Sequence, residues 1–213
     1  MDSSPSTSDS LDRTDRPTVI GVVGGVASGK STVARLLEQW GAHRIDADRM
    51  AKEALERDDV RHALLKRFGA DILDSDGRVI RAELARHVFD APDASANRTF
   101  LEELTHPIVR AAILEEIKRL EKRSVPAVVL DVPLLLEVGW GELCDEIVFV
   151  DAPDELRRRR AEERGWDEST WRRREAAQWP VATKRAQATA VIDNGSDRES
   201  LEKQLRQWWA SRD

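Results

Sequence analysis

Residues 21–32, GVVGGVASGKST, have the composition and spacing of a loop that holds phosphate groups. Gly24, Gly29, Lys30 and Ser31 fit the pattern G-x-x-x-x-G-K-[ST]. In such a loop, successive backbone N–H groups point at phosphate oxygens, and the N-terminus of the next helix adds positive charge. The lysine can bridge the β- and γ-phosphates of ATP, and the serine hydroxyl can ligate Mg²⁺. The predicted contacts are Gly25, Ala27, Ser28, Gly29, Lys30, Ser31 and Thr32.

A chance glycine turn carrying a surface lysine is the alternative interpretation of this pattern. The flanking sequence favours the phosphate loop, because an apolar run rich in β-branched residues, 18–23, precedes it. Residues 31–40 follow it with apolar side chains at the spacing of one helix face. A strand before and a helix after are the context that this motif requires.

Three aspartates that follow predicted strands are candidates for metal or proton chemistry. The strand AHRID ends at an acidic pair, Asp46 and Asp48, and Asp131 ends the strand AVVLD. The carboxyl ends of parallel strands face the ligand crevice of an open sheet. We predict that Asp131 holds a water molecule on Mg²⁺ and that Asp46 is an outer Mg²⁺ group. Hydrogen-bonded or solvated strand ends are the alternatives for both.

Two absences narrow the type of reaction. The chain has no Asn-Lys-x-Asp element of the kind that reads guanine, which argues against a GTPase. Asp131 is followed by Val132, whereas an ATPase that activates water often has a glutamate there. Transfer of phosphate to a bound acceptor is therefore favoured over transfer to water.

The elements that must position these residues alternate along the chain. Buried strands are predicted at TVIGVV, AHRID, AVVLD, EIVFV and AVID, with helices between them and an amphipathic helix at LEKQLRQWWA. This alternation predicts a parallel, three-layer α/β fold. Residues 51–123 are mostly helical in pattern, with Pro107 expected to interrupt the long helical segment and to start a new helix.

Bulk composition excludes several classes of protein. The 213 residues carry a net charge of −6 with a pI near 5.4, which argues against a nucleic-acid binder held by bulk charge. No apolar run is long enough to span a membrane, so a cytoplasmic protein is expected. The single cysteine allows no internal disulfide. Residues 1–17 have the composition of a disordered tail, and 18–213 form one expected domain.

The stretch GGVASGKSTVARLLEQWGAHRIDADRMAKEAL resembles the opening of the dephospho-CoA kinases. The resemblance continues through THPIVRAAI, VLDVPLLLEVGWGELCDEIVFVDAP and AVIDNGS, in the order of that family. It implies a P-loop kinase fold with a helical acceptor-binding insertion at about 50–123 and a lid at about 154–185. The implied reaction moves the γ-phosphate of ATP to the ribose 3′-hydroxyl of dephospho-CoA, with Mg²⁺, as the last step of coenzyme A synthesis.

The resemblance also implies roles for single residues. Asp48 would orient and deprotonate the acceptor hydroxyl, although an aspartate there can equally be the N-cap of a helix. Arg160 and Arg164 align with lid positions that neutralise the triphosphate, in a segment (157–185) with ten Lys or Arg and five Asp or Glu. A solvated helix with ion pairs is the alternative for most of these arginines.

Three positions carry weaker expectations. His106 would shape the acceptor site, or simply form a turn with the proline that follows it. Asn194 would lend backbone groups to adenine, or belong to a plain turn. Ala27 replaces the glycine usual in the family, and its N–H remains available if its φ is negative. We expect a monomer or weak homo-oligomer. A nucleoside or nucleotide kinase and a non-catalytic nucleotide-dependent module are the rival functions.

Overall fold

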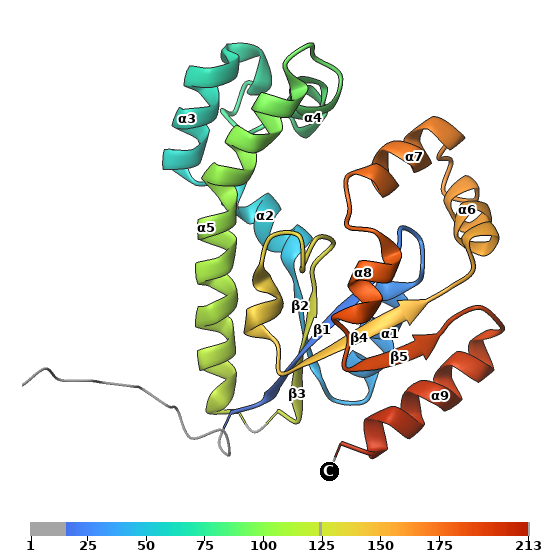
Figure 1. Ribbon diagram of the computed structural model, residues 1–213. Coiled ribbons are helices and arrows are strands. Elements are labelled where there is room, and N and C mark those ends of the chain that lie inside the picture. The colour runs from blue at the N-terminus through green and yellow to red at the C-terminus, as the bar shows by residue number, and fades with distance from the viewer. Residues whose placement is uncertain (1–15, 124, 213) are drawn as a thin grey trace, which may run out of the picture.

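A computed structural model describes residues 16–123 and 125–212 of the chain. One five-stranded sheet has the order β2-β3-β1-β4-β5, and every pairing in it is parallel (Figure 1). The predicted parallel α/β sheet is therefore confirmed, and each strand lies close to its predicted bounds. The strands are β1 (Thr18–Gly24), β2 (His43–Asp46), β3 (Ala127–Asp131), β4 (Glu146–Asp151) and β5 (Ala190–Asp193).

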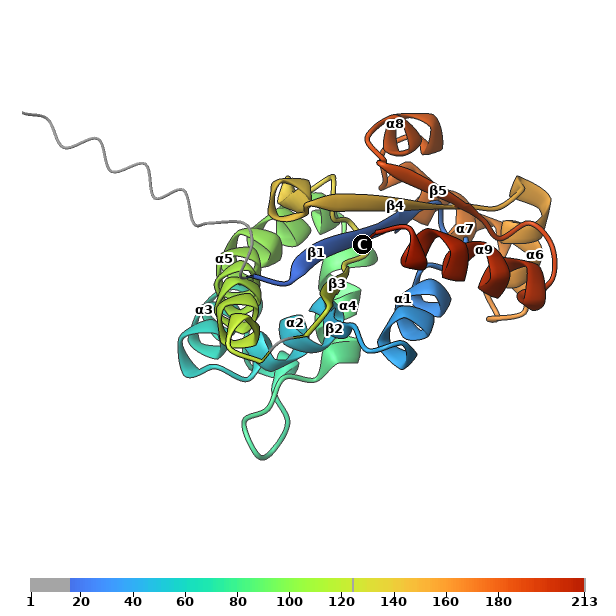
Figure 2. The ribbon, with the colours of Figure 1, turned by 90° about the horizontal axis from the view of Figure 1, so that it is seen from below.

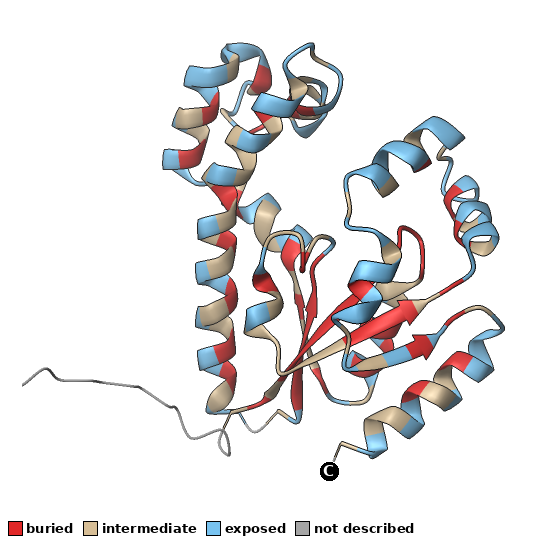
Figure 3. Cartoon of the chain, in the orientation of Figure 1, coloured by how far each residue is buried: buried red, intermediate tan, exposed pale blue. Residues whose placement is uncertain are grey.

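Helices cover both faces of the sheet, because strands with apolar side chains on both sides must be buried twice. On one face, α1 (Lys30–Gln39) and α9 (Arg198–Ala210) pack their apolar stripes against β1 and β4 (Figure 2). On the other face, α2 (Ala47–Leu55), the second half of α5 (Ala94–Glu121) and the segment after β3 form a second core. The central strands β1 and β3 are buried along almost their whole length and β4 at residues 148–150, whereas the edge strands β2 and β5 are only partly buried (Figure 3).

The helical insertion has a small hydrophobic core of its own. It adds α3 (Asp58–Phe68), the short η1 (Ala70–Ile72) and α4 (Arg81–Phe89) to the first half of α5. Val60, Leu64, Ile72, Leu84 and Val88 are buried together there. The buried residues of the insertion therefore form a cluster separate from the two cores on the faces of the sheet.

The prediction that Pro107 interrupts the long helical segment is wrong. Helix α5 runs without a break from Ala94 to Glu121, with Pro107 inside it. Proline removes the hydrogen bond to the carbonyl four residues back, at Glu103. Pro107 and Glu103 are both exposed, so water can solvate this carbonyl. The same long helix then buries Val109 and Ile113 against the sheet.

Three helices follow β4 in the segment predicted as a lid. They are α6 (Asp154–Glu162), α7 (Glu168–Ala176) and α8 (Val181–Ala186). Ala161 and Trp171 pack on Val26 and Ala27 of the phosphate loop, so the lid segment has an apolar contact with that loop. A short 3-10 helix, η2 (Trp140–Leu143), precedes β4.

The predicted tail, residues 1–17, lies outside the described residues except for Arg16 and Pro17. The Arg16 guanidinium donates to both carboxylate oxygens of Asp145, at 2.9 and 2.6 Å. Asp145 also accepts from the Val19 N–H at the start of β1. In the part of the chain that the structure describes, no helix is both long and apolar enough to cross a membrane.

Candidate active site

The loop between β1 and α1 encloses the lysine of the phosphate motif. Lys30 Nζ donates to the carbonyls of Gly24, at 3.1 Å, and Gly25, at 3.0 Å. Burial and the nearby Lys184 ammonium lower the pKa of Lys30 to about 8. Ser31 is exposed in the first turn of α1, where backbone N–H groups have no partner within the helix. The loop thus offers a positive charge, free helix-end donors and an accessible hydroxyl.

Ala27 has a positive φ of 58°, so the condition of a negative φ set out for its N–H is not met. The reason is a tight turn, in which the Ser28 N–H donates to the Gly25 carbonyl at 3.2 Å. Ala27 is the third residue of this turn, the position at which a type II turn requires a left-handed backbone. An L-residue pays about 1–2 kcal/mol for this conformation. The loop keeps its shape with alanine, at a cost that glycine would avoid.

Asn194 and Arg160 brace the outside of the loop. The Ser28 carbonyl accepts from Asn194 Nδ2 at 2.7 Å and from Arg160 Nη1 at 3.3 Å. Arg160 Nη2 also donates to the Asn194 carbonyl at 3.1 Å, and the Asn194 N–H donates to Asp151. Gly29 must be glycine here, since an added Cβ would lie 2.1 Å from Asn194 Nδ2. Both predicted residues therefore reach the loop, and burial lowers the pKa of Arg160.

The structure does not bring Arg164 to the same place. Its side chain is exposed, and its guanidinium lies 5.8 Å from the centre of the Trp166 ring. Thr32, the last residue of the predicted loop contacts, donates its N–H to the Gly29 carbonyl at 2.9 Å. Among the residues predicted to contact phosphate, Arg164 and Thr32 are thus the two least well placed to bind a ligand.

An arginine links the aspartates at the carboxyl end of the sheet. Asp46 and Asp131 are register partners on β2 and β3. Arg44 donates Nε and Nη2 to Asp131 Oδ2, at 3.1 and 2.7 Å, and Nη2 to Asp46 at 3.1 Å. Asp46 is also the N-cap of α2, because its Oδ1 accepts from the Arg49 N–H. The cap considered for Asp48 thus belongs to Asp46.

Asp48 lies at the rim of a pocket of about 180 Å³ between α2, α5 and the segment after β3. Partial burial, and then repulsion from Asp46 and Asp131, raise the pKa of its carboxyl. His106 lines the same pocket and makes an edge-on contact with the Trp140 ring, with centroids 5.6 Å apart. The two residues predicted for the acceptor therefore lie at one cavity.

The carboxylates fit a divalent cation that is held mainly by water and phosphate. Asp46 and Asp131 raise the cost of ionising Asp48, which a cation beside the three carboxylates would relieve. No group of three or more His, Cys, Asp or Glu side chains arranged to hold a metal occurs among residues 16–123 and 125–212. Mg²⁺ needs no such cage, since it keeps several waters and uses substrate phosphates as ligands.

A larger cavity, of about 760 Å³, lies between the insertion and the lid segment. Helix α4 contributes Phe89, which is 60% exposed, and α7 contributes its basic face. The arrangement suits a ligand with both an anionic and an apolar part. The arginines that line it are Arg86, Arg98, Arg173 and Arg174.

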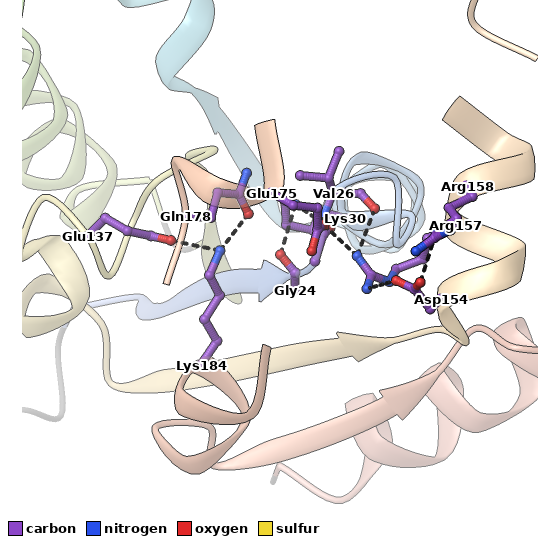
Figure 4. Close-up of polar contacts among 11 residues, drawn as sticks. Gly24, Val26, Lys30, Glu137, Asp154, Arg157, Arg158, Glu175, Gln178 and Lys184 are labelled. Atoms are coloured by element: carbon purple, nitrogen blue, oxygen red, sulfur yellow. Dashed lines mark hydrogen bonds and ion pairs between the residues drawn. The ribbon is translucent and has the colours of Figure 1, made fainter. Parts of the chain in front are cut away.

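Sequence reasoning missed several charged residues around the loop. Arg157 is 6% exposed and lies against the loop, and Lys184 is 2% exposed and bonded to Glu137 at 2.7 Å and Gln178 at 2.6 Å (Figure 4). Strand alternation could have placed Arg44 on the face of Asp46, two residues away. The sequence carries no comparable signal for the pairing of Lys184 with Glu137, which lie far apart in the chain.

Comparison with known proteins agrees with this geometry. The sequence profile of the family described as dephospho-CoA kinase matches residues 18–199. A dephospho-CoA kinase of Corynebacterium diphtheriae is 40% identical over 193 residues, which cover 90% of this chain and 95% of that protein. One of Geobacillus kaustophilus is 38% identical over 195 residues, covering 89% of this chain and 96% of that protein.

Solved structures share the fold over almost the whole chain. The crystal structure of TT1252 from Thermus thermophilus is 38% identical, with a TM-score of 0.76 over 93% of this chain and 99% of that one. A dephospho-CoA kinase from Campylobacter jejuni, 24% identical, has a TM-score of 0.64 over 92% of this chain and 97% of that one, which bears on the fold alone. On the family profile and these relatives, the chain belongs to the dephospho-CoA kinase family.

Proposed function

We propose that the chain transfers the γ-phosphate of ATP to the ribose 3′-hydroxyl of dephospho-CoA, giving ADP and coenzyme A. The observation that carries the proposal is the shared edge of the sheet. The loop around Lys30 follows β1, while Asp131 ends β3 beside β1 and Asp48 follows β2. A phosphate donor and a hydroxyl acceptor can therefore meet at the carboxyl end of three neighbouring strands.

On the phosphate side, positioning and charge neutralisation supply most of the catalysis. Lys30 binds the β- and γ-phosphates, and Gly25 together with the residues from Ala27 to Thr32 surrounds them. Arg160 and, after closure of the lid, Arg164 neutralise developing charge. Ser31 directly and Asp131 through water would hold Mg²⁺, which supplies further charge neutralisation when bound. Asn194 keeps the loop in shape and borders the adenine site.

On the acceptor side, Asp48 holds the incoming hydroxyl in line with the γ-phosphate. Its raised pKa makes it a better proton acceptor than an ordinary aspartate, although orientation is the larger contribution. His106 shapes the wall of the pocket beside it. The pocket is small and fits a sugar or part of a base, so the rest of the acceptor must lie elsewhere.

The larger cavity between α4 and α7 is our candidate for the remaining part of the acceptor. Dephospho-CoA carries a diphosphate and a long pantetheine arm. Guanidinium groups suit phosphate oxygens, and the exposed Phe89 ring suits an alkyl chain. We propose further that the enzyme works in the cytoplasm as a monomer or weak homo-oligomer, with ATP and dephospho-CoA as its partners and neither nucleic acid nor membrane.

An acceptor panel tests the proposed reaction. Purified protein with ATP and Mg²⁺ is assayed against dephospho-CoA and against nucleosides and nucleoside monophosphates, and the phosphorylated position is located by phosphorus NMR. We expect a much higher kcat/KM for dephospho-CoA, with phosphate on the 3′-oxygen. A preference for a nucleoside or nucleoside monophosphate would instead support a nucleoside or nucleotide kinase.

A further inference from the structure

One backbone donor of the phosphate loop is already occupied by a carboxylate. The Val26 N–H donates to Glu175 Oε1 at 2.9 Å, and Glu175 lies near the end of α7 in the lid segment (Figure 4). Val26 itself is only 5% exposed. A carboxylate resembles a phosphate group in charge and in the hydrogen bonds that it accepts. The lid segment thus places an anion on a loop built to receive one.

Arg157 holds this carboxylate in place. Its Nη1 donates to Glu175 Oε1 at 2.5 Å and reaches the Val26 carbonyl at 3.4 Å, while Nη2 donates to Asp154. The guanidinium also lies over the Trp171 ring of α7, 5.1 Å from its centre. The contact between lid and loop is therefore a partly buried, charge-assisted bond, with a buried arginine packed behind it.

The loop is shaped to accept this arginine. An added Cβ on Gly25 would lie 2.4 Å from Arg157 Nη1 and 2.8 Å from Cζ, so a side chain at this position would displace the guanidinium. Among the described residues, two buried side-chain atoms have no hydrogen-bond partner: Arg157 Nε, which lies at this contact, and Ser28 Oγ, elsewhere in the loop. Leaving a buried donor unpaired costs free energy. Arg157 Nε is therefore a donor that a further anion can use.

We infer that Glu175 is an internal competitor of the nucleotide's phosphates, held on the empty loop by Arg157 and displaced when ATP binds. The inference rests on the proposed function, because it assigns the loop to ATP. Displacement frees the Val26 N–H and leaves Arg157 positive beside the bound phosphates. Part of the binding energy of ATP is then used to release the lid, which makes the apparent affinity weaker than the loop alone would give.

Substitution Glu175→Gln tests the inference with little change of shape. The amide oxygen can still accept from the Val26 N–H, but its charge and its strong bond to Arg157 are lost. We expect calorimetry with Mg²⁺ and ATP, without acceptor, to show binding about three- to tenfold tighter than wild type. Unchanged or weaker binding, in a protein with a wild-type circular dichroism spectrum and melting temperature, would overturn the inference.

Glu168→Gln is the matched control, because it removes the same charge from the same helix. Glu168 pairs with Arg172 at 2.8 Å, on the exposed side of α7. The Glu168→Gln variant should bind ATP with the affinity of wild type. If both variants bind ATP more tightly by the same factor, the effect is due to net charge, which would refute the competitor role of Glu175. Absence of ATP binding in wild type as well would overturn the proposed function, whereas binding without transfer to dephospho-CoA would overturn only the acceptor assignment.

Discussion

The two halves of the site are built in different ways. On the phosphate side, Val26 and Ser28 are buried, and the loop is tied by backbone bonds and by contacts from Arg160 and Asn194. On the proposed acceptor side, Asp48 lines a small pocket between α2, α5 and the segment after β3. A loop that binds through its backbone suits phosphate, a group that many ligands share. Side chains from distant elements suit the choice of one acceptor.

The largest effect should come from removing the charge at the phosphate side. Lys30→Ala should lower kcat/KM by about 10³–10⁵, the range for a cation that stabilises a transferring phosphoryl group. Binding of dephospho-CoA, measured by calorimetry, should change little, since Lys30 does not line the acceptor pocket. The exposed Lys203→Ala is the control. If Lys30→Ala weakened the binding of ATP and of dephospho-CoA by the same factor, the two halves of the site would not be separate.

Asp48→Asn should affect the other half alone. We expect kcat to fall by about 10²–10⁴, the usual contribution of a positioned general base, with the affinity for ATP unchanged. Steady-state kinetics and calorimetry check the two quantities separately, with the exposed Asp76→Asn as control. A kcat within about threefold of wild type would remove Asp48 from the mechanism.

The affinity for ATP should depend on pH through Lys30. Its pKa of about 8 lies below the ordinary value of 10.5, so the unliganded enzyme loses the ammonium charge as pH rises through 8. Between pH 7.5 and 9, the Kd for ATP should rise about five- to tenfold. Calorimetry at several pH values, with circular dichroism to verify folding, measures this. A flat profile would show that Lys30 stays charged throughout.

The smallest effect concerns the strained residue of the loop. Ala27→Gly removes the free-energy cost of the positive φ but adds conformational entropy to the unfolded chain, which opposes the gain. The net effect should stabilise the protein by about 0.5–1 kcal/mol. The melting temperature should rise by about 1–4 °C. Ala112→Gly, at an exposed position inside α5, should lower stability by a similar amount. A lower melting temperature for Ala27→Gly would contradict the strain.

The sequence predicted local features better than contacts between distant segments. The strand-loop-helix pattern around Lys30 is contiguous, so its period and glycines were sufficient to place it. The predicted break at Pro107 was wrong because burial of Val109 and Ile113 in the same helix outweighs the tendency of proline to interrupt a helix. The pairing of Glu175 with Val26 joins residues 149 positions apart, and no spacing rule identifies such a pair.

The φ of Ala27 shows a further limit of sequence reasoning. Alanine normally avoids the left-handed region, but the sequence left the sign of this φ open. The turn from Gly25 to Ser28 demands a positive φ, and packing of Ala27 with Trp171 and Ala161 accompanies the strained form. Similarly, the side-chain hydrogen bond from Asn194 to Ser28 depends on how β5 ends beside the loop, which the sequence of either segment does not specify.

A crystal structure with a non-hydrolysable ATP analogue, Mg²⁺ and dephospho-CoA would test the central claim most directly. The claim is that the loop around Lys30 and the carboxylate of Asp48 bring one phosphate and one hydroxyl together. We predict the terminal phosphate against Lys30 and the ribose 3′-oxygen about 2.6–3.2 Å from an Asp48 oxygen. A 3′-oxygen outside hydrogen-bond reach of Asp48, with both ligands fully bound, would contradict it.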